Sequence, residues 1–418
     1  MTGYADATEG ELAEPIELME FRLKVRAFLA EHAPRRSTRR DDDGVVTASA
    51  AEDLATQKAF QAALADAGLA GLTWPKPWGP GGTAEQQGIF GEEAASYDLP
   101  ITTFLIGLGM VIPTIIEFGT DAQRARYVGK ALRGEEIWSQ LFSEPGAGSD
   151  VASLQMRAEC DGDEWVLNGQ KVWTTGAQVS DFGAVIARTS LERPKHRGIT
   201  MFIIDFTAPG VEIRPLRQMN GGSGFNEVFF TDVRVPDANR IGDVDDGWRC
   251  AVAMLMNERV AIGSGGGGRS IGVAPLIELA RRRGRLDEPL VRDGIVDVYI
   301  RTKILGLIGQ RTRAASKAGK APGPEGSVAK LVGALLARRT SDLGIAIAGV
   351  GGQAWMDARD SRWALAVLSA PASRIAGGTD EVQRNIIGER VLGLPKEPQV
   401  DRELPFKELR VGTQSPRA

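Results

Sequence analysis

Cysteine and histidine are scarce in this chain, with only two of each among 418 residues. Cys160 and Cys250 lie far apart and in no spaced pattern, so the sequence predicts no disulfide framework and fits a reducing cytoplasm. A histidine-based metal site or a Ser-His-Asp triad would have to use His32 or His196. The first ends a helix-like segment and the second lies in a polar run that is typical of a solvated loop. We therefore expect no metal site, and we expect acid–base chemistry to depend on a carboxylate.

Long apolar runs are also lacking, and none approaches the length that spans a membrane. The N-terminus is acidic and polar and has no secretory pattern. A net charge of −4 gives no general attraction to nucleic acid or to an anionic membrane. The 43% hydrophobic and 25% charged residues are typical of a soluble globular protein. We expect a cytoplasmic protein with neither a nucleic-acid partner nor membrane insertion.

The apolar spacing changes twice along the chain and predicts three folded parts. Residues 14–138 have helical spacing, residues 139–243 alternate as short strands, and residues 244–394 return to helical spacing. Residues 1–13 and 395–418 are polar, and we expect them to form an N-terminal arm and a C-terminal tail. The expected fold class is α+β, with a helical domain, a compact β domain and a helical bundle in that order.

Local signals refine this division at two places. Asn168-Gly169 tolerates the positive φ angles of a tight primed turn, so we expect a hairpin whose strands are residues 165–167 and 171–173. Residues 120–123, Thr-Asp-Ala-Gln, predict a capping box at the start of a helix. Further short strands are expected at residues 181–188, 198–206 and 227–235.

Residues 143–150, Ser-Glu-Pro-Gly-Ala-Gly-Ser-Asp, carry the most informative motif. Small residues, hydroxyls and unblocked backbone N–H groups in one turn suit an anionic or heteroatom-rich ligand. Trp173-Thr174-Thr175 is predicted to bring a flat indole and two hydroxyls to the same region. The two segments together predict one wall of a pocket for a planar, hydrogen-bonding cofactor. Alternatively, Trp173 is a core aromatic, and the hydroxyls of Ser143, Ser149 and Thr175 cap turns and strand ends.

Residues 263–268, Gly-Ser-Gly-Gly-Gly-Gly, match the G-x-G-x-x-G pattern of dinucleotide-binding proteins. That fingerprint requires a preceding strand within a βαβ unit, whereas residues 251–262 have helical spacing. We interpret the glycines as a helix face that permits close approach, and not as a dinucleotide site.

With these motifs in this order, the chain resembles the acyl-CoA dehydrogenase family of flavoproteins along nearly its whole length. The matching stretches are residues 143–150, 168–175, 233–236 and 378–384. The resemblance implies a β-barrel-like middle domain, a C-terminal four-helix bundle and an FAD cofactor between them, in a homotetramer or a dimer. It also implies α,β-dehydrogenation of an acyl-CoA thioester to the trans-2-enoyl-CoA, as in the β-oxidation of fatty acids, with an electron-transfer flavoprotein as the acceptor.

The resemblance implies roles for individual residues. Phe142 and Ser143 would lie along the flavin, Trp173 would cover the isoalloxazine, and Thr175 would lie near its reactive nitrogen. Ser149 matches a position that contacts the CoA part of the substrate. Other cofactor positions are Thr174, Thr379, Glu381, Arg281, Gly351 and Gly352, and other substrate positions are Arg259, Gly377 and Gly378.

Two departures from the family pattern bear on the chemistry. Gly377 occupies the position where many members carry the glutamate base. In the isovaleryl- and long-chain-type branches the base comes from the first bundle helix, and Glu258 matches that position, within Met256-Asn257-Glu258-Arg259. The alternative for Glu258 is a helix-surface ion pair. The second departure is at residues 281–285, Arg-Arg-Arg-Gly-Arg, which lack the aromatic residue of the family pattern. This run either contacts the FAD of a neighbouring subunit or is simply a cationic helix end.

Three functions remain open at this point. The first is an acyl-CoA dehydrogenase in which Glu258 takes the α-proton and FAD takes the β-hydride. The second is a non-catalytic subunit of a heteromeric acyl-CoA dehydrogenase, and the third is a flavin oxidase or monooxygenase on the same fold. The position of the base is compatible with a branched, long or bulky acyl group, and the sequence leaves the acyl chain open.

Overall fold

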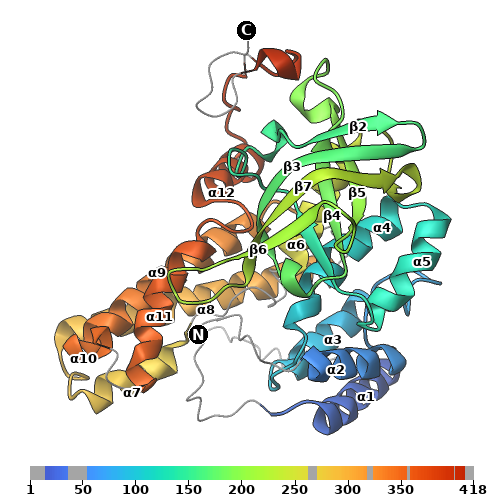
Figure 1. The fold of residues 1–418 in the computed structure, drawn as a ribbon. Helices are drawn as coiled ribbons and strands as arrows, with labels where there is room; N and C mark the ends of the chain where they lie inside the picture. Colours follow the sequence, from blue (N-terminus) through green and yellow to red (C-terminus); the bar gives the residue numbers. More distant parts are fainter. Residues whose placement is uncertain are drawn as a thin grey trace, which may run out of the picture.

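The computed structural model describes residues 15–35, 54–261, 271–317, 323–354, 358–399 and 401–409. The sheet lies above an N-terminal group of helices on one side and an elongated C-terminal group of helices on the other (Figure 1). This arrangement confirms the predicted α+β fold class. The glycine-rich segment at residues 263–268, interpreted above as a helix face, lies outside the described residues.

The N-terminal part is helical, as its spacing predicts. Its helices are α1 (Ile16–His32), α2 (Leu54–Asp66), α3 (Ala84–Ala94), α4 (Ile112–Phe118) and α5 (Asp121–Leu132). The expected capping box begins α5: Gln123 N donates to Thr120 Oγ1, and Thr120 N donates to Gln123 Oε1. Val25, Leu29 and Leu64 belong to the core of this part.

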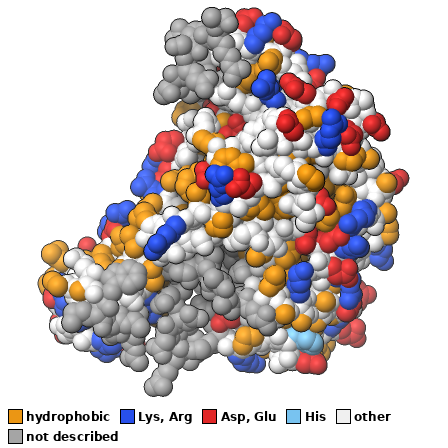
Figure 2. All heavy atoms as spheres, viewed as in Figure 1, with side chains coloured by type: hydrophobic (Ala, Val, Ile, Leu, Met, Phe, Trp, Pro, Cys, Tyr) orange, Lys and Arg blue, Asp and Glu red, His pale blue; other side chains and the backbone are white. Residues whose placement is uncertain are grey.

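The middle part is one sheet of eight strands. They are β1 (Trp138–Leu141), β2 (Arg157–Asp161), β3 (Glu164–Thr175), β4 (Phe182–Arg188), β5 (Ile199–Asp205), β6 (Val211–Leu216), β7 (Phe225–Pro236) and β8 (Arg240–Ile241). The strand order is β6-β7-β3-β2-β4-β5-β8, with β1 parallel to β4. Strand β6 was not predicted; it lies at the edge of the sheet, where Pro215 is tolerated. On the face seen in Figure 2, basic and acidic side chains are interspersed.

The predicted hairpin around Asn168-Gly169 is wrong, because β3 runs through both residues without turning. The pairing of β3 with β7 shifts register between Leu167 and Gly169, and Gly169 has a φ of 148°. Asn168 is tied to β7, since its Nδ2 donates to Asp232 Oδ1 at 3.0 Å. The hairpin forms instead between β2 and β3, where Gly162 has a φ of 70°. A residue pair that tolerates unusual φ suits a bulge as well as a turn, and long-range pairing with β7 selects the bulge.

The C-terminal part is a helical bundle, as predicted. Its helices are α6 (Gly247–Ala261), α7 (Val273–Arg282), α8 (Pro289–Lys317), α9 (Gly326–Ala348), α10 (Val350–Gln353), α11 (Ala358–Ser373) and α12 (Asp380–Ile386). Helices α8, α9 and α11 lie side by side (Figure 1). A Cβ atom at Gly344 would lie 1.8 Å from the buried ring of Trp363, so α9 and α11 pack closely only with glycine there. Among the described helices, none is long and apolar enough to cross a membrane.

The two cysteine thiols are expected to differ strongly in reactivity. Cys160 is exposed, whereas Cys250 is buried at the start of α6, and burial raises the pKa of its thiol to about 12. At pH 8 the thiolate fraction of Cys250 is then roughly a thousandfold below that of an ordinary cysteine. Dithionitrobenzoate should modify one thiol of the native protein quickly and the second only after denaturation. Equal rates for both native thiols would contradict this, and Cys160→Ser should remove the fast phase.

Candidate active site

The loop that follows β1 presents its small residues to solvent. Glu144 and Ala147 exchange two backbone hydrogen bonds of 3.0 Å each, which closes a tight turn. Phe142 and Ala147 are buried and anchor the turn, whereas Gly148 and Ser149 are exposed. The motif at residues 143–150 therefore forms a tight turn that is anchored by buried residues and exposes its backbone, which suits a ligand rich in heteroatoms.

Trp173 lies at an irregularity of β3 and projects out of the sheet. Its side chain is 60% exposed and its φ is 62°, a value that bulky residues rarely adopt. Its ring meets the edge of Phe225 at a centroid distance of 6.0 Å. The core-aromatic alternative is therefore wrong for Trp173. A strained backbone that holds an apolar ring in solvent is typical of a binding site.

The two residues after Trp173 face opposite ways. Thr174 is 1% exposed, and its Oγ1 has no hydrogen-bond partner among the described residues. Thr175 is exposed, and its carbonyl accepts a hydrogen bond of 2.8 Å from Ser139 Oγ. Trp173 and Thr175 therefore provide an aromatic face and a hydroxyl on the outside of β3, while Thr174 belongs to the interior.

A buried ion pair holds the loop and β3 together. Lys171 is fully buried, and its Nζ donates to Glu144 Oε1 at 2.8 Å and to the carbonyl of Phe142 at 3.0 Å. Burial lowers the pKa of Lys171, while Glu144 opposes that shift. Beside this pair, Val172 N donates to the carbonyl of Ser143 at 2.9 Å. Sequence reasoning missed Lys171 and Glu144, because Lys171 follows the polar residues Asn168 and Gln170 and nothing in the local sequence marks it as buried.

A second buried cation fixes the far end of the loop. Arg188, the last residue of β4, donates to the carbonyls of Ala152 at 2.6 Å and Leu154 at 3.3 Å. Lys195 Nζ lies 2.9 Å from the carboxylate of Asp150. Although burial opposes its charge, hydrogen bonds from Ser153 and Lys195 hold the pKa of Asp150 below its ordinary value. The stretch from 144 to 154 is thus anchored at both ends.

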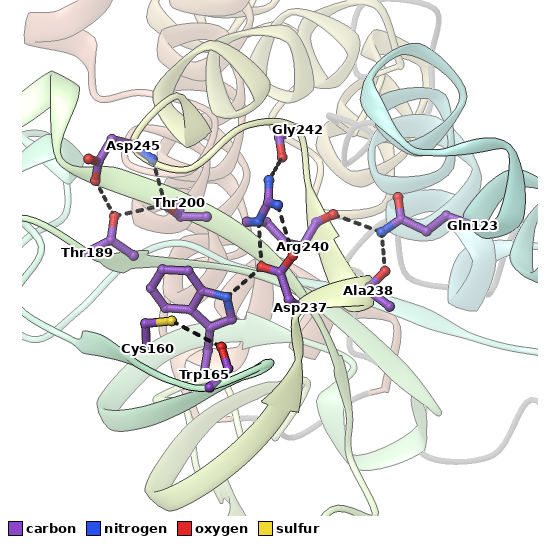
Figure 3. A network of polar contacts seen from close by, with 11 residues as sticks. Gln123, Cys160, Trp165, Thr189, Thr200, Asp237, Ala238, Arg240, Gly242 and Asp245 are labelled. Carbon is purple, nitrogen blue, oxygen red and sulfur yellow. Dashed lines mark hydrogen bonds and ion pairs between the residues drawn. The ribbon is translucent and has the colours of Figure 1, made fainter.

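Polar contacts between the sheet and the chain before α6 set where that helix begins (Figure 3). Asp245 accepts a hydrogen bond of 2.6 Å from Thr189 Oγ1, and its backbone N–H donates to Thr200 Oγ1 at 2.9 Å. Gln123 Nε2 donates to the carbonyls of Ala238 and Arg240, both at 2.8 Å, which ties α5 to the same segment. Helix α6 therefore starts from a fixed point on the sheet.

His196 is not a solvated loop residue as predicted. It is half-buried in a short turn of helix, and its ring meets the ring of Trp248 near the start of α6 at a centroid distance of 4.9 Å. Burial and the neighbouring Lys195 lower the pKa of His196, so packing against α6 favours the neutral ring.

Helix α6 shares a hydrophobic core with the loop at residues 143–150. Ala251 and Met254 belong to the same buried cluster as Phe142 and Ala147. Glu258 comes four positions after Met254, one turn further along α6. Glu258 and Arg259 lie within the bounds of the helix, and their side chains lie outside the described residues. The predicted base therefore lies one helical turn beyond the part of α6 that joins this buried cluster.

Gly247→Ala is expected to displace α6. A Cβ atom at Gly247 would lie 2.6 Å from the backbone of Thr200 and Met201 in β5, and backbone atoms cannot yield as a flexible side chain can. Overpacking of this kind costs about 1–3 kcal/mol of unfolding free energy, which denaturant titration measures. Gly129→Ala is the control: Gly129 is exposed in α5 with nothing within 4 Å, so the change should be neutral or stabilising. Equal midpoints for the two variants would contradict the expected clash.

The turn before α12 is built by its two glycines. Gly377 and Gly378 have φ angles of 66° and 90°, and the carbonyl of Gly377 accepts a hydrogen bond from Gln383 Nε2 at 2.9 Å. Thr379 Oγ1 accepts from Val382 N at 3.2 Å and so caps α12. Glu381 is exposed and lies 3.4 Å from Arg384. Capping accounts for Thr379 locally, and roles of Thr379 and Glu381 toward a cofactor stay predictions.

The remaining predicted cofactor residues lie elsewhere in the chain. Arg281 is at the end of α7, and Gly351 and Gly352 are in α10. These two helices lie together at the end of the bundle remote from the sheet (Figure 1), and a Cβ atom at Gly351 would lie 3.2 Å from Arg283. The structure therefore groups these residues with one another, and separates them from Trp173 of the same chain.

The side chains around the loop fit a flavin. Trp173 offers a flat aromatic face, and Thr175, two residues later, is exposed. Ser143 is joined to Val172 by a backbone hydrogen bond, and the exposed turn at Gly146 and Gly148 offers unobstructed backbone. A planar, heteroatom-rich ring system needs such a combination of stacking surface and hydrogen-bonding groups.

Comparison with known proteins gives matches along most of the chain. The family models described as acyl-CoA dehydrogenase N-terminal, middle and C-terminal domains match residues 16–135, 139–233 and 245–392. Acyl-CoA dehydrogenase IpdE1 of Mycobacterium tuberculosis is 38% identical over 390 residues, covering 91% of this chain and 99% of the relative. Acyl-CoA dehydrogenase FadE34 of the same organism is 39% identical over 80% of this chain, which matches only 46% of FadE34. The solved structure named Tcur3481-Tcur3483 steroid ACAD is 27% identical, with a TM-score of 0.75 over 92% of this chain and 99% of that one.

Proposed function

The chain belongs to the acyl-CoA dehydrogenase family, and from that premise we propose that it dehydrogenates a bulky acyl-CoA with FAD as cofactor and Glu258 as base. The observation that carries this proposal is the wall formed by residues 143–150 and the exposed, strained Trp173, which the buried Lys171–Glu144 pair holds together. Buried residues of α6, the helix of Glu258, belong to the same hydrophobic cluster as Phe142 and Ala147 of this wall.

The proposed division of labour follows from the chemistry of each group. Ser143, Trp173 and Thr175 would hold FAD, and the bound cofactor would supply the two-electron oxidation. Glu258 would remove the α-proton, because burial beside an apolar substrate raises the pKa of a carboxylate toward that task. Backbone N–H groups near the thioester oxygen would stabilise the developing enolate. Ser149 would contact the CoA part, and Arg259 would position either α6 or that part.

For the substrate we propose a ring-bearing acyl group. A structure similar to this chain is named a steroid ACAD. Gly377 stands at the position that carries the glutamate base in many members of the family, so this chain would have no side-chain volume there. A base on α6 leaves that side of the pocket free for a wide acyl group.

We also propose that the chain assembles as a homotetramer or a dimer. Exposed apolar side chains recur at helical spacing on α8, at Val296, Ile300, Ile304 and Leu307. The remote position of Arg281 and Gly351 fits a role toward the FAD of a neighbouring subunit. Electrons would pass to an electron-transfer flavoprotein.

Anaerobic titration of the FAD-loaded protein tests the proposal. We expect ring-bearing acyl-CoAs to bleach the flavin at lower concentration than short straight-chain ones. A flavin that no acyl-CoA bleaches would contradict catalysis and favour a silent subunit, and mass measurement would show whether a second chain is needed. Peroxide formed stoichiometrically in air would favour an oxidase.

A further inference from the structure

Residues 401–409 return to the sheet domain and pair with the loop after β4 (Figure 1). Phe406 N donates to the carbonyl of Arg193 at 2.9 Å, and Lys407 N donates to the carbonyl of Leu191 at 3.1 Å. We call residues 401–409 the C-terminal strap. The strap lies beyond the last residue that the C-terminal family domain matches, so the three domains do not account for it.

Phe406 is the part of the strap that reaches the interior. Its ring is 6% exposed, and the guanidinium carbon of Arg188 lies 3.8 Å from the ring centroid. Arg188 itself is 2% exposed, and burial lowers its pKa to about 10. An arginine stacked on an aromatic face gains a cation–π attraction that is stronger when both groups are shielded from water.

Phe406 also borders a cavity of about 490 Å³, whose further lining residues are Gln155, Arg157, Asn168, Gly169 and Leu191. Truncation of the ring would extend this cavity to the guanidinium of Arg188 and admit water to it. The ring therefore keeps a buried cation shielded at a place where no other side chain of the strap is comparably buried.

Arg188 also contacts the loop at residues 149–154. Its guanidinium binds the carbonyls of Ala152 and Leu154, directly after the exposed Ser149. It also donates to the carbonyl of Lys195 at 2.6 Å, and Lys195 Nζ pairs with Asp150 at 2.9 Å. One buried group thus holds Ala152 and Leu154 directly and, through Lys195, is linked to Asp150, the residue after Ser149. Phe406 covers that group.

We propose that the C-terminal strap sets the affinity for the CoA part of the substrate, with Phe406 and Arg188 as positioning residues that act through the loop at residues 149–154. This inference rests on the proposed function. Neither residue takes part in the chemistry, because both lie behind the loop and not at its exposed surface. Loss of the ring should therefore weaken binding while the chemical step is unchanged.

Steady-state kinetics of Phe406→Ala provide the first test. We expect KM for the acyl-CoA, and the inhibition constant of free CoA, to rise about tenfold, while kcat stays within about twofold and FAD remains bound. Phe406→Trp keeps an aromatic face and should restore the wild-type KM. Lys407→Ala, on the exposed side of the strap, should change neither constant. An unchanged KM in Phe406→Ala, or a kcat that falls in proportion, would overturn the proposal.

Hydrogen exchange provides a second test that does not depend on turnover. Leu154 N donates to the carbonyl of Val151, and Arg188 N donates to the carbonyl of Met156. We expect these amides to exchange faster in Phe406→Ala than in the wild type, and at the wild-type rate in Phe406→Trp. Unchanged exchange would overturn the strap as a support of the loop. If no acyl-CoA bleaches the wild-type flavin, the proposed function fails, while the exchange result and free-CoA affinity still decide the inference.

Discussion

Glu258→Gln is expected to bind FAD normally and to lose reduction of the flavin by acyl-CoA. The amide of glutamine cannot accept the α-proton, although it has nearly the same size and shape as the carboxylate. Removal of a general base costs roughly 10²–10⁴-fold in the step that it assists. Anaerobic stopped-flow absorbance, which follows bleaching of the flavin, measures that step directly and separates it from binding.

Matched variants identify the base. Glu278→Gln removes an exposed carboxylate from α7, the next helix along the chain, and should leave the rate unchanged. Adding Gly377→Glu to Glu258→Gln would place a carboxylate at the commoner family position. Because Gly377 has a φ of 66°, that variant should carry strain of about 1–2 kcal/mol and recover little activity. A wild-type rate in Glu258→Gln alone would show that another group removes the proton.

Lys171→Met is expected to produce the largest loss of stability. Methionine matches the length of the lysine stem but leaves Glu144 buried without its cation, and it frees the carbonyl of Phe142. Breaking a buried ion pair by removing one partner costs about 3–5 kcal/mol. Guanidinium denaturation monitored by tryptophan fluorescence should show this loss, and FAD should dissociate more readily because the wall at residues 143–150 loses its support.

The double variant Lys171→Met/Glu144→Gln distinguishes the causes. It removes both charges, so it should recover part of the stability that the single variant loses. Recovery is incomplete because the backbone N–H groups of Gln155 and Met156 donate to the two Glu144 oxygens, and glutamine keeps only one of these acceptors. Arg234→Met removes an exposed arginine that pairs with Glu164 and Asp161, and it should leave the denaturation midpoint unchanged. If Lys171→Met were as stable as Arg234→Met, the buried pair would not be the support that the geometry indicates.

The local sequence pattern was sufficient to predict an element wherever the residues of that element alone determine its structure. Helical spacing before residue 139 and after residue 243, and alternation between them, predicted the order of helices and strands. The Thr120–Gln123 box was readable because both partners lie within one turn. Asn168-Gly169 was misread because a bulge and a hairpin make the same demand on φ, and only the pairing with β7 separates them.

The sequence indicated which types of residue form the candidate site, but not which tertiary contacts hold them in place. By itself the sequence determined the α+β fold, and it predicted a ligand-binding loop at 143–150 with the indole of Trp173 beside it. Tertiary structure alone decided that Trp173 stands in solvent, that Lys171 binds Glu144 across 27 residues, and that Phe406 covers Arg188. The residues in each of these contacts lie far apart in the chain, and the sequence around one residue does not indicate which residue it contacts. Periodicity reports which face of an element is buried, and burial alone does not say against what.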